Sequence, residues 1–481
     1  MPDAEGSPAT LVRRAIGHPV VDADGHLIPY MPALFEMVAE IAGRDVERGL
    51  RRYLATRRSS GPEFAPVRTF FGVPAKNTLD RMTATLPGLL YERMDEFGID
   101  VALLYPTGLS LLTCGDDEIR RAAATAYNRY VAEVYRPYGD RLVPVAMIPT
   151  FDPSEAVEEV ERATALGLRA VVMSGVIPRQ DRSEGAGAAW IDTLGHGSRH
   201  DYDPLWGRLE QLGLVAAFHG LGYGWGSRMS TTNYVYNHLG SFAVAQEAVC
   251  RSLLMGGVPR RFPDLRFAFL EGGVAWAVQL LADVIGHYGK RNRHVIRDLD
   301  PASLDVDLAD RLFDRYAEGR LASCHATAES GAFGGLGTMV TATEVADIDD
   351  FAESLVDSVA DIVGTFSGQF YFGCEADDPL NGLAFSTELL PSGTALHALF
   401  ASDIGHWDVP DMRDVLPEAW ELVEHGHLNR EQFRDFSFAN AVWMLGGANP
   451  NFFEGTIIAD DARSLLNGDA GHGATASTNK N

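Results

Sequence analysis

The segment VVDADGHLIPY places two carboxylates and an imidazole at the end of an apolar run, at Asp22, Asp24 and His26. Successive side chains of a strand point to opposite faces, so these three are expected on one face of an extended chain. Carboxylates and imidazole are metal ligands, and such a cluster at a strand end predicts a metal site. The alternative is a simple turn, because Asp24-Gly25 is a common turn dipeptide.

Further ionisable side chains stand at the ends of other apolar runs. They are His219 in LVAAFHG, Glu271 in FAFLEGG, Glu375 in YFGCE and Asp403 in ALFASD. Taken singly, each has an ordinary interpretation as a core histidine, a turn-capping aspartate or a solvated acid. Together, Asp24, His26, His219 and Asp403 offer two nitrogens and two carboxylates, a set that suits Zn, Mn or Fe and leaves room for a bound water.

Eight short apolar runs are the predicted strands that carry these residues. They span 18–26, 100–106, 142–150, 168–174, 214–220, 265–273, 369–375 and 398–403. Continuous apolar runs are typical of strands buried on both faces. Helical patterns lie between many of them, at 117–135, 153–166, 241–255 and 273–287. Strands that alternate with helices predict an α/β fold, here a (β/α)8 TIM barrel, whose active site lies at the carboxyl ends of the strands.

Long segments interrupt this pattern after predicted strands 1, 4 and 6. They cover residues 31–95, 175–203 and 289–368. Loops of that length inside a compact domain usually have a function. We therefore expect a single barrel domain over 1–458 with three inserted segments, followed by a largely disordered tail over 459–481.

Composition excludes several classes of partner. The chain has 481 residues and a formal net charge of −26, and its basic runs are short, so neither nucleic acid nor an anionic membrane is an expected partner. The four cysteines are far apart, which fits a reducing compartment. No apolar stretch approaches the ~20 residues of a membrane helix. We expect a cytoplasmic protein, in a homo- or hetero-oligomer.

Several motifs together resemble the amidohydrolase-related branch of the amidohydrolase superfamily, which includes the aminocarboxymuconate-semialdehyde decarboxylase-like enzymes. They are VDADGHLIP, DEFGIDVALLYPTG, AAFHG, GGVPRRFPDLRFAFLEGGVAW and FASDIGHWDVPDM. The resemblance covers most of the chain and implies a (β/α)8 barrel with a divalent metal at its mouth, held by Asp24, His26, His219 and Asp403.

Two positions depart from the family pattern. Asp24 stands where many relatives have histidine, which makes the site more anionic and favours Mn or Fe. Glu271 stands where the well-known decarboxylases place a catalytic histidine, so their chemistry does not transfer directly. Glu271 is expected to be a general base, a partner of a histidine ligand or a ligand of a second metal, and the alternative is a structural carboxylate.

A mechanism follows from the charge of the metal. A divalent ion lowers the pKa of bound water from about 15.7 to around 7. Asp403 is the expected general base for that water, and His238 and His406 are the expected acid/base or orienting residues. His238 precedes a helix, so packing or capping is an equal interpretation for it.

The substrate is predicted to be a small organic molecule, aromatic or carboxylated. Tyr223 and Trp407 are expected to supply aromatic walls, and Arg228 to hold a substrate carboxylate, although a lone arginine is more often a surface charge. The leading prediction is a hydrolase that activates a metal-bound water. The alternatives are a non-oxidative decarboxylase on the same ligands, a dinuclear iron or manganese oxygenase, and a non-catalytic subunit of a hetero-oligomer.

Overall fold

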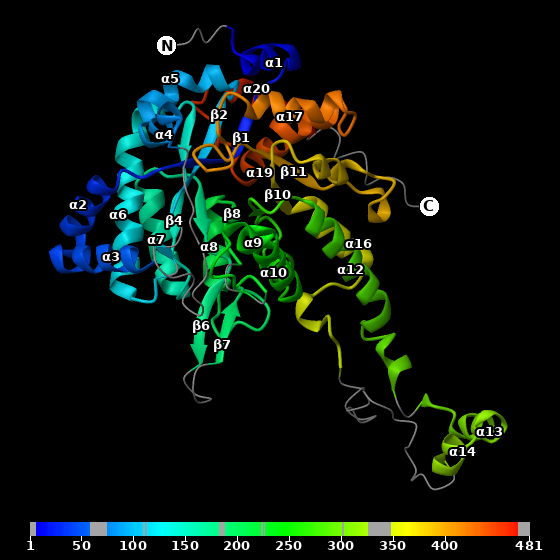
Figure 1. Ribbon diagram of the computed structural model, residues 1–481. Helices are drawn as coiled ribbons and strands as arrows, with labels where there is room; N and C mark the ends of the chain where they lie inside the picture. Colours follow the sequence, from blue (N-terminus) through cyan, green and yellow to red (C-terminus); the bar gives the residue numbers. More distant parts are fainter. Residues whose placement is uncertain are drawn as a thin grey trace.

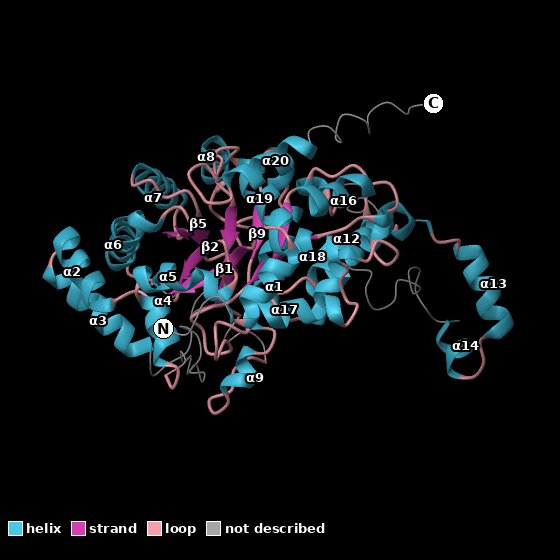
Figure 2. Cartoon of the chain, turned by 90° about the horizontal axis from the view of Figure 1, so that it is seen from above, coloured by secondary structure: helices cyan, strands magenta, loops and turns pink. Residues whose placement is uncertain are grey.

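Parallel strands form the middle of the molecule and helices surround them (Figures 1 and 2). The computed structural model describes residues 6–57, 75–108, 111–112, 114–181, 188–222, 225, 227–300, 303–325 and 348–469. A three-stranded sheet has the order β1 (Val21–Leu27), β2 (Val101–Pro106), β3 (Leu142–Pro144). A six-stranded sheet has the order β11 (His397–Ala401), β10 (Phe370–Glu375), β9 (Phe267–Phe269), β8 (Ala216–Phe218), β5 (Val171–Met173), β4 (Ala146–Ile148).

Backbone contacts join the two sheets at both of their edges. β3 and β4 are consecutive halves of one extended segment, paired with β2 on one side and with β5 on the other. At the other edge, the backbone N–H of His26 donates to the carbonyl of Ile404, and that of Asp403 donates to the carbonyl of Asp24. All eight predicted strands are therefore present in parallel pairs, and the α/β prediction of the barrel type is confirmed.

Helices surround the strands, and two of the four predicted helices begin at a capping aspartate. The side chain of Asp116 accepts from the backbone N–H of Ile119 at the start of α6, and Asp152 accepts from that of Ser154 at the start of α7. The helices are α1 (Pro8–Ile16), α6 (Asp117–Tyr135), α7 (Pro153–Ala165), α8 (Asp203–Leu212), α9 (Tyr234–His238), α10 (Ser241–Met255), α11 (Val258–Arg261), α12 (Ala275–Arg291), α16 (Val359–Gly368), α17 (Val415–Glu424), α18 (Arg430–Arg434) and α19 (Asn440–Ala448). In the described part of the chain, no helix combines the length and the apolarity needed to cross a bilayer.

The segments that interrupt the strand–helix pattern have structures of their own. After β1 come α2 (Met31–Ala42), α3 (Arg44–Arg57), α4 (Thr78–Thr85) and α5 (Pro87–Phe97). After β5 comes an antiparallel hairpin of β6 (Ile177–Asp181) and β7 (Ala188–Asp192). After α12 come α13 (Val306–Tyr316) and α14 (Arg320–His325), which project away from the barrel in both views (Figures 1 and 2). The division into one domain with insertions stays a prediction.

The disorder predicted from residue 459 onward is wrong over Ala459–Asp469, which form helix α20. Ala462 is buried, and Leu465 and Leu466 pack against a core cluster that includes Met444 and Leu445 of α19. The segment folds because these small and apolar residues lie on one side of the helix, a spacing that its polar composition hides. Residues 470–481 lie outside the described part.

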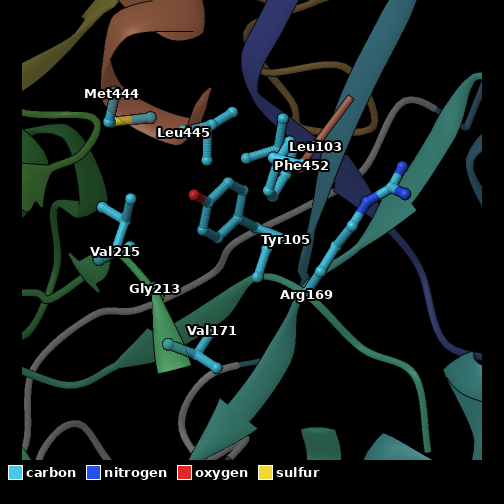
Figure 3. A pocket seen from close by; sticks show the side chains of 11 residues that line it. Leu103, Tyr105, Arg169, Val171, Gly213, Val215, Met444, Leu445 and Phe452 are labelled. Carbon is cyan, nitrogen blue, oxygen red and sulfur yellow. The ribbon is translucent and has the colours of Figure 1, made fainter. Parts of the chain in front are cut away.

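A small cavity lies beside the starts of β5 and β8 (Figure 3). Its volume is about 10 Å³, and Tyr105 lies among the apolar side chains around it. Met444 and Leu445 of α19 and Phe452 also line it. Since that volume is about that of one water probe, the cavity holds no substrate.

Candidate metal centre

The carboxyl ends of the strands bring the predicted ligands into one region. Asp24 and His26 lie in β1, His219 directly follows β8, Glu271 follows β9 by two residues, Glu375 ends β10 and Asp403 follows β11 by two residues. This is the end of a barrel at which active sites are found. Side chains separated by nearly four hundred positions thus line one site.

The ligand atoms fall into two overlapping groups that could each hold a metal ion. The first ligand group is Asp24, His26 and His219, and the second ligand group is His26, Glu271, Asp403 and His406. Within each group the ligand atoms lie within 4.8 Å of one another. The four predicted ligands are therefore close together, but they are not all in one group. Asp403 belongs to the second group, Asp24 and His219 belong to the first, and His26 belongs to both.

Close contacts connect the two groups. His26 Nε2 lies 3.6 Å from Asp24 Oδ1 and 3.1 Å from Asp403 Oδ1. His219 Nε2 lies 2.7 Å from Glu271 Oε2, and His406 Nδ1 lies 2.5 Å from Asp403 Oδ1. The rings of His26 and His406 stack with their centroids 3.7 Å apart. The six side chains form one continuous cluster with His26 in the middle.

A bulge in β1 separates Asp22 from the cluster. The pairing of β1 with β2 shifts register between Asp22 and Gly25. A Cβ at Gly25 would lie 2.4 Å from Asp22 Oδ2, so only glycine fits there. Asp22 accepts hydrogen bonds from the backbone N–H and the hydroxyl of Ser402 at 3.0 and 2.5 Å. Asp22 therefore fixes the end of β11. It lies outside both ligand groups, although alternation along the strand placed it on the same face as Asp24 and His26.

Two of the cluster residues have left-handed backbones, which side chains other than glycine rarely adopt. The φ angles are 56° at Glu271 and 48° at Asp403. Such conformations cost about 1–3 kcal/mol each, and they concentrate at functional sites. The strand ends are therefore bent where these two carboxylates enter the site.

The carboxyl groups of the cluster are held in an environment that disfavours their charge. Burial is the largest cause that raises the pKa of Asp403 to about 8, and burial followed by the charge of Asp403 raises the pKa of Asp24 and of Glu271 well above the ordinary values. The pKa of Glu375 is raised by the same two causes. Without a cation, the charged forms of these acids are therefore disfavoured.

The pKa values of the histidines are lowered instead of raised. Burial, and then the neighbouring His406, lowers the pKa of His219 to about 3, and the same causes lower the pKa of His26 well below its ordinary value. Burial lowers the pKa of His406 to about 4. All three are therefore neutral at physiological pH, which is the form that binds a metal.

A divalent metal fits these residues. Buried atoms converge here that lie close to one another but make no hydrogen bond in the described structure: Asp24 Oδ1, His26 Nε2, His219 Nε2, Glu271 Oε2 and both carboxylate oxygens of Asp403. Buried polar atoms are normally satisfied, so such a concentration at one place needs an explanation. A bound cation supplies it, because neutral imidazoles and carboxylates are its natural ligands.

Rings extend from the cluster toward the surface and form what we call the aromatic wall, made of Phe242, His238, Trp407 and Tyr234. His219 contacts Phe242 with centroids 5.3 Å apart, and Phe242 contacts His238 at 5.7 Å. Trp407 contacts His238 at 5.6 Å and Tyr234 at 5.9 Å, and it is 40% exposed. The wall therefore reaches from a metal ligand to solvent.

A protein-family model described as amidohydrolase matches residues 21–322, which is more than half of the chain. The chain belongs to the amidohydrolase family. The predicted resemblance is thus confirmed, and with it the prediction of a metal-dependent enzyme. No curated protein is significantly similar to the chain.

Solved structures are similar to this amidohydrolase-family chain at low identity. An amidohydrolase from Mycobacterium avium subsp. paratuberculosis is 17% identical, with a TM-score of 0.50, over 89% of this chain and 100% of its own. A 5-carboxyvanillate decarboxylase from Novosphingobium aromaticivorans, with bound manganese, is 11% identical, with a TM-score of 0.48, over 89% and 97%. A 2,6-dihydroxybenzoate decarboxylase from Rhizobium is 14% identical, with a TM-score of 0.44, over 89% and 98%. At these identities, the likeness shows the fold alone.

The other predicted residues of this amidohydrolase have different surroundings. Arg228 donates from Nη2 to the carbonyls of Leu239 and Gly240, so its guanidinium supports the connection between α9 and α10. Tyr223 lies outside the described residues. The roles predicted for these two residues and for Trp407 stay predictions.

Sequence reasoning missed Asp408, at the rim of the site. The Asp408 side chain is exposed at the rim, but the protein around it desolvates it in part, and this desolvation together with the adjacent Asp403 raises the pKa of Asp408 to about 7. The motif DIGHWD contained the signal, since its second aspartate follows two residues that we had assigned to the mouth, His406 and Trp407. Phe242 and Tyr234 were missed because their positions depend on how α9 and α10 fold over the strands.

Proposed function

We propose that the protein is a metal-dependent decarboxylase that removes the carboxyl group of a small aromatic acid without oxidation. The observation that carries this proposal is the aromatic wall beside the metal ligands. A planar ring can pack against Phe242, His238 and Trp407, whose neighbouring rings are nearly perpendicular to one another, by face-to-face and edge-to-face contacts while its carboxylate reaches the cluster. The family membership supports metal chemistry at this position.

The metal would be held by the first ligand group together with Asp403. When bound, it supplies the positive charge that binds the substrate carboxylate and offsets the surrounding acids. His406, 2.5 Å from Asp403 Oδ1, keeps that carboxylate in place. Thr107, 3.3 Å from His406 Nε2, holds the imidazole ring in turn.

The proton that the reaction consumes would come from Asp408. A general acid works best when its pKa is close to the working pH, and that of Asp408 is raised to about 7. The bond between the ring and the carboxyl carbon breaks, and its electron pair stays on the ring carbon. That carbon takes the proton of Asp408, carbon dioxide leaves, and solvent returns a proton to Asp408.

Hydrolysis of a neutral carbonyl compound is the second candidate. It is favoured by the charge of the site, because no arginine or lysine of the described residues is paired with Asp24, Glu271 or Asp403. A neutral ester or amide would enter such a site more easily than an anion. Asp403 would then accept the proton of the attacking water.

Release of carbon dioxide under anaerobic conditions is the decisive assay. The manganese-loaded protein is incubated with a panel of hydroxylated aromatic acids and, separately, with aryl esters and amides. Carbon dioxide release without oxygen supports the decarboxylase. Turnover of the esters or amides alone supports the hydrolase, and turnover that requires oxygen contradicts both candidates.

The Asp408→Asn variant tests the proposed proton donor. We expect it to lose roughly 10²–10⁴-fold in rate, the usual contribution of a general acid, while it retains its metal. Asp414→Asn is the matched control, because Asp414 is an exposed carboxylate on the same segment. Equal rates in both variants would remove Asp408 from the mechanism.

A further inference from the structure

We propose that helices α13 and α14, which we call the arm, form the surface on which a second copy of this chain docks. In this arrangement, α13 of one copy packs antiparallel to α13 of the other. The arm follows α12 along the chain and lies apart from the barrel in both views (Figures 1 and 2). The inference concerns a surface other than the barrel mouth and does not depend on the proposed function.

Apolar side chains of the arm face solvent. The structure describes every residue of α13 and α14, and none of them is buried. Leu308, Leu312 and Tyr316 recur at every fourth position, so they form one ridge along α13. Tyr316 is 66% exposed, and Leu321 of α14 is 63% exposed. An exposed apolar face of this kind marks an interaction site.

Contacts within the arm cover a different side of α13. The ring of Phe313 stacks on that of His325 with centroids 4.2 Å apart, and His325 Nε2 lies 3.2 Å from Asp310 Oδ1. Helices of 11 and 6 residues are too short to be stable in isolation. Since α14 does not bury the ridge, a partner from outside the arm is needed to cover it.

The charges beside the ridge favour a second copy as that partner. Asp307, Arg311 and Arg315 each precede a ridge residue by one position, so they follow the ridge along one edge. In a two-fold symmetric antiparallel pair centred on Leu312, Asp307 of one copy lies opposite Arg315 of the other, and this pairing occurs twice. Arg311 lies near the axis. The edge, acidic at its start and basic at its end, is thus complementary to a reversed copy of itself.

The interface is small, because α13 has 11 residues and spans about 16 Å. Interfaces that bury less than ~1,200 Å² in total are typical of weak association. We therefore expect a reversible dimer that depends on protein concentration. Because each arm projects from its barrel, two copies can meet arm to arm while the barrels stay apart (Figure 1).

Sedimentation velocity of the full-length chain, over a range of concentrations, tests the docking. We expect the wild type to shift from monomer to dimer as the concentration rises. Leu312→Glu should stay monomeric at the highest concentration, with native circular dichroism. Leu389→Glu is the matched control, because Leu389 is an exposed leucine outside the arm, and it should dimerise like the wild type.

A wild type that stayed monomeric would overturn the inference, because the ridge would then be covered by another part of the chain or by a different protein. A Leu312→Glu variant that still dimerised, or a Leu389→Glu variant that did not, would also overturn it, because the second copy would then dock elsewhere.

Charge reversal tests the antiparallel orientation. Asp307→Arg and Arg315→Asp, made singly, each turn two attractive pairs into two repulsive ones, so we expect the Kd of the dimer to rise by roughly 10-fold or more. The double variant restores opposite charges, and its Kd should return to within roughly 3-fold of the wild-type value. Single reversals without effect, or a double reversal as weak as the single ones, would contradict the arrangement.

Discussion

His26 is the residue on which the geometry of the site depends. Its Nε2 is the atom nearest to both Asp24 and Asp403, and its ring stacks on that of His406. It is fully buried, and its backbone N–H donates to the carbonyl of Ile404, so the ring is fixed by the junction of β1 with the end of β11. A ligand positioned in this way is preorganised for its metal.

Replacement of His219 by alanine tests the ligand role at the far side of the first ligand group. We expect the affinity for Mn²⁺ to fall by more than the roughly 100-fold that the loss of an outer hydrogen-bond partner costs. Isothermal titration of the stripped protein measures it. His427→Ala, an exposed histidine, is the control. Unchanged affinity in His219→Ala, with native circular dichroism, would contradict the role.

The sequence was sufficient to locate Asp24, His26, His219 and Asp403, because each stands where an apolar run ends. It could not place them relative to one another. The division into two ligand groups depends on the bent backbones of Glu271 and Asp403, and those bends depend on contacts between distant strands. The bond between Asp22 and Ser402 is equally non-local, which is why alternation along β1 gave Asp22 the wrong role.

At the scale of elements, a buried ion network attaches the segment after β1 to the loop after β11. Arg93 of α5 donates to Asp80 of α4 at 2.7 Å and to Glu96 at 2.8 Å. Asp80 also accepts from the backbone N–H of Met412. The loop that carries His406 is therefore held by helices inserted far earlier in the chain.

The Arg93→Met variant removes the cation that pairs with Asp80 and Glu96. It leaves Glu96 with only the more distant Arg413, 3.9 Å away. Loss of one partner of a buried ion pair costs about 3–5 kcal/mol, so we expect a reduction of that size in the free energy of unfolding. Urea denaturation measures it. Arg129→Met, at an exposed pair with Glu133, is the control and should change little. A small effect at Arg93 would mean that the network does not hold the loop.

The bulge of β1 gives a second test at this scale. Gly25→Ala would place a Cβ 2.4 Å from Asp22 Oδ2 and 3.3 Å from the carbonyl of Leu103. We expect a loss of about 1–3 kcal/mol in stability, as for other overpacked cores, together with weaker metal binding. Gly364→Ala, inside α16 with open space around it, should be neutral or stabilising. Thermal unfolding with and without Mn²⁺ compares the two variants.

Elements with strong local signals were predictable and the others were not. The eight strands were visible as buried apolar runs, and α6 and α7 as amphipathic patterns behind capping aspartates. The hairpin β6–β7 and helix α20 were missed, since they depend on packing against surfaces that the sequence does not reveal.

The whole chain has a formal net charge of −26, and some of its acidic side chains lie at the barrel mouth as well as on the surface. Five acids gather at the mouth of the barrel, and metal binding must offset their mutual repulsion. Stability and metal loading are therefore expected to be coupled, because binding to the folded state alone stabilises it. The cytoplasmic location and the oligomeric state stay predictions.

This coupling predicts how the stability of the metal-free protein depends on pH. The pKa of Asp403 is raised to about 8 in the folded protein, so the folded state keeps a proton that the unfolded state has already lost. The free energy of unfolding therefore falls as the pH rises toward 8. His219, with its pKa lowered to about 3, acts oppositely, but only below about pH 6.5. Between pH 6.5 and 8.5, the free energy of unfolding should therefore fall.

Urea denaturation at pH 6.5, 7.5 and 8.5, with chelator and with Mn²⁺, measures the effect. Because the ion binds deprotonated carboxylates and neutral imidazoles, its stabilisation should grow as the pH rises. In the metal-free Asp403→Asn variant, the fall should be smaller, since one of the titrating groups is gone. A metal-free stability that stayed level or rose over this range would show that the acids at the barrel mouth are already charged and compensated, and the case for a cation between them would lose its electrostatic basis.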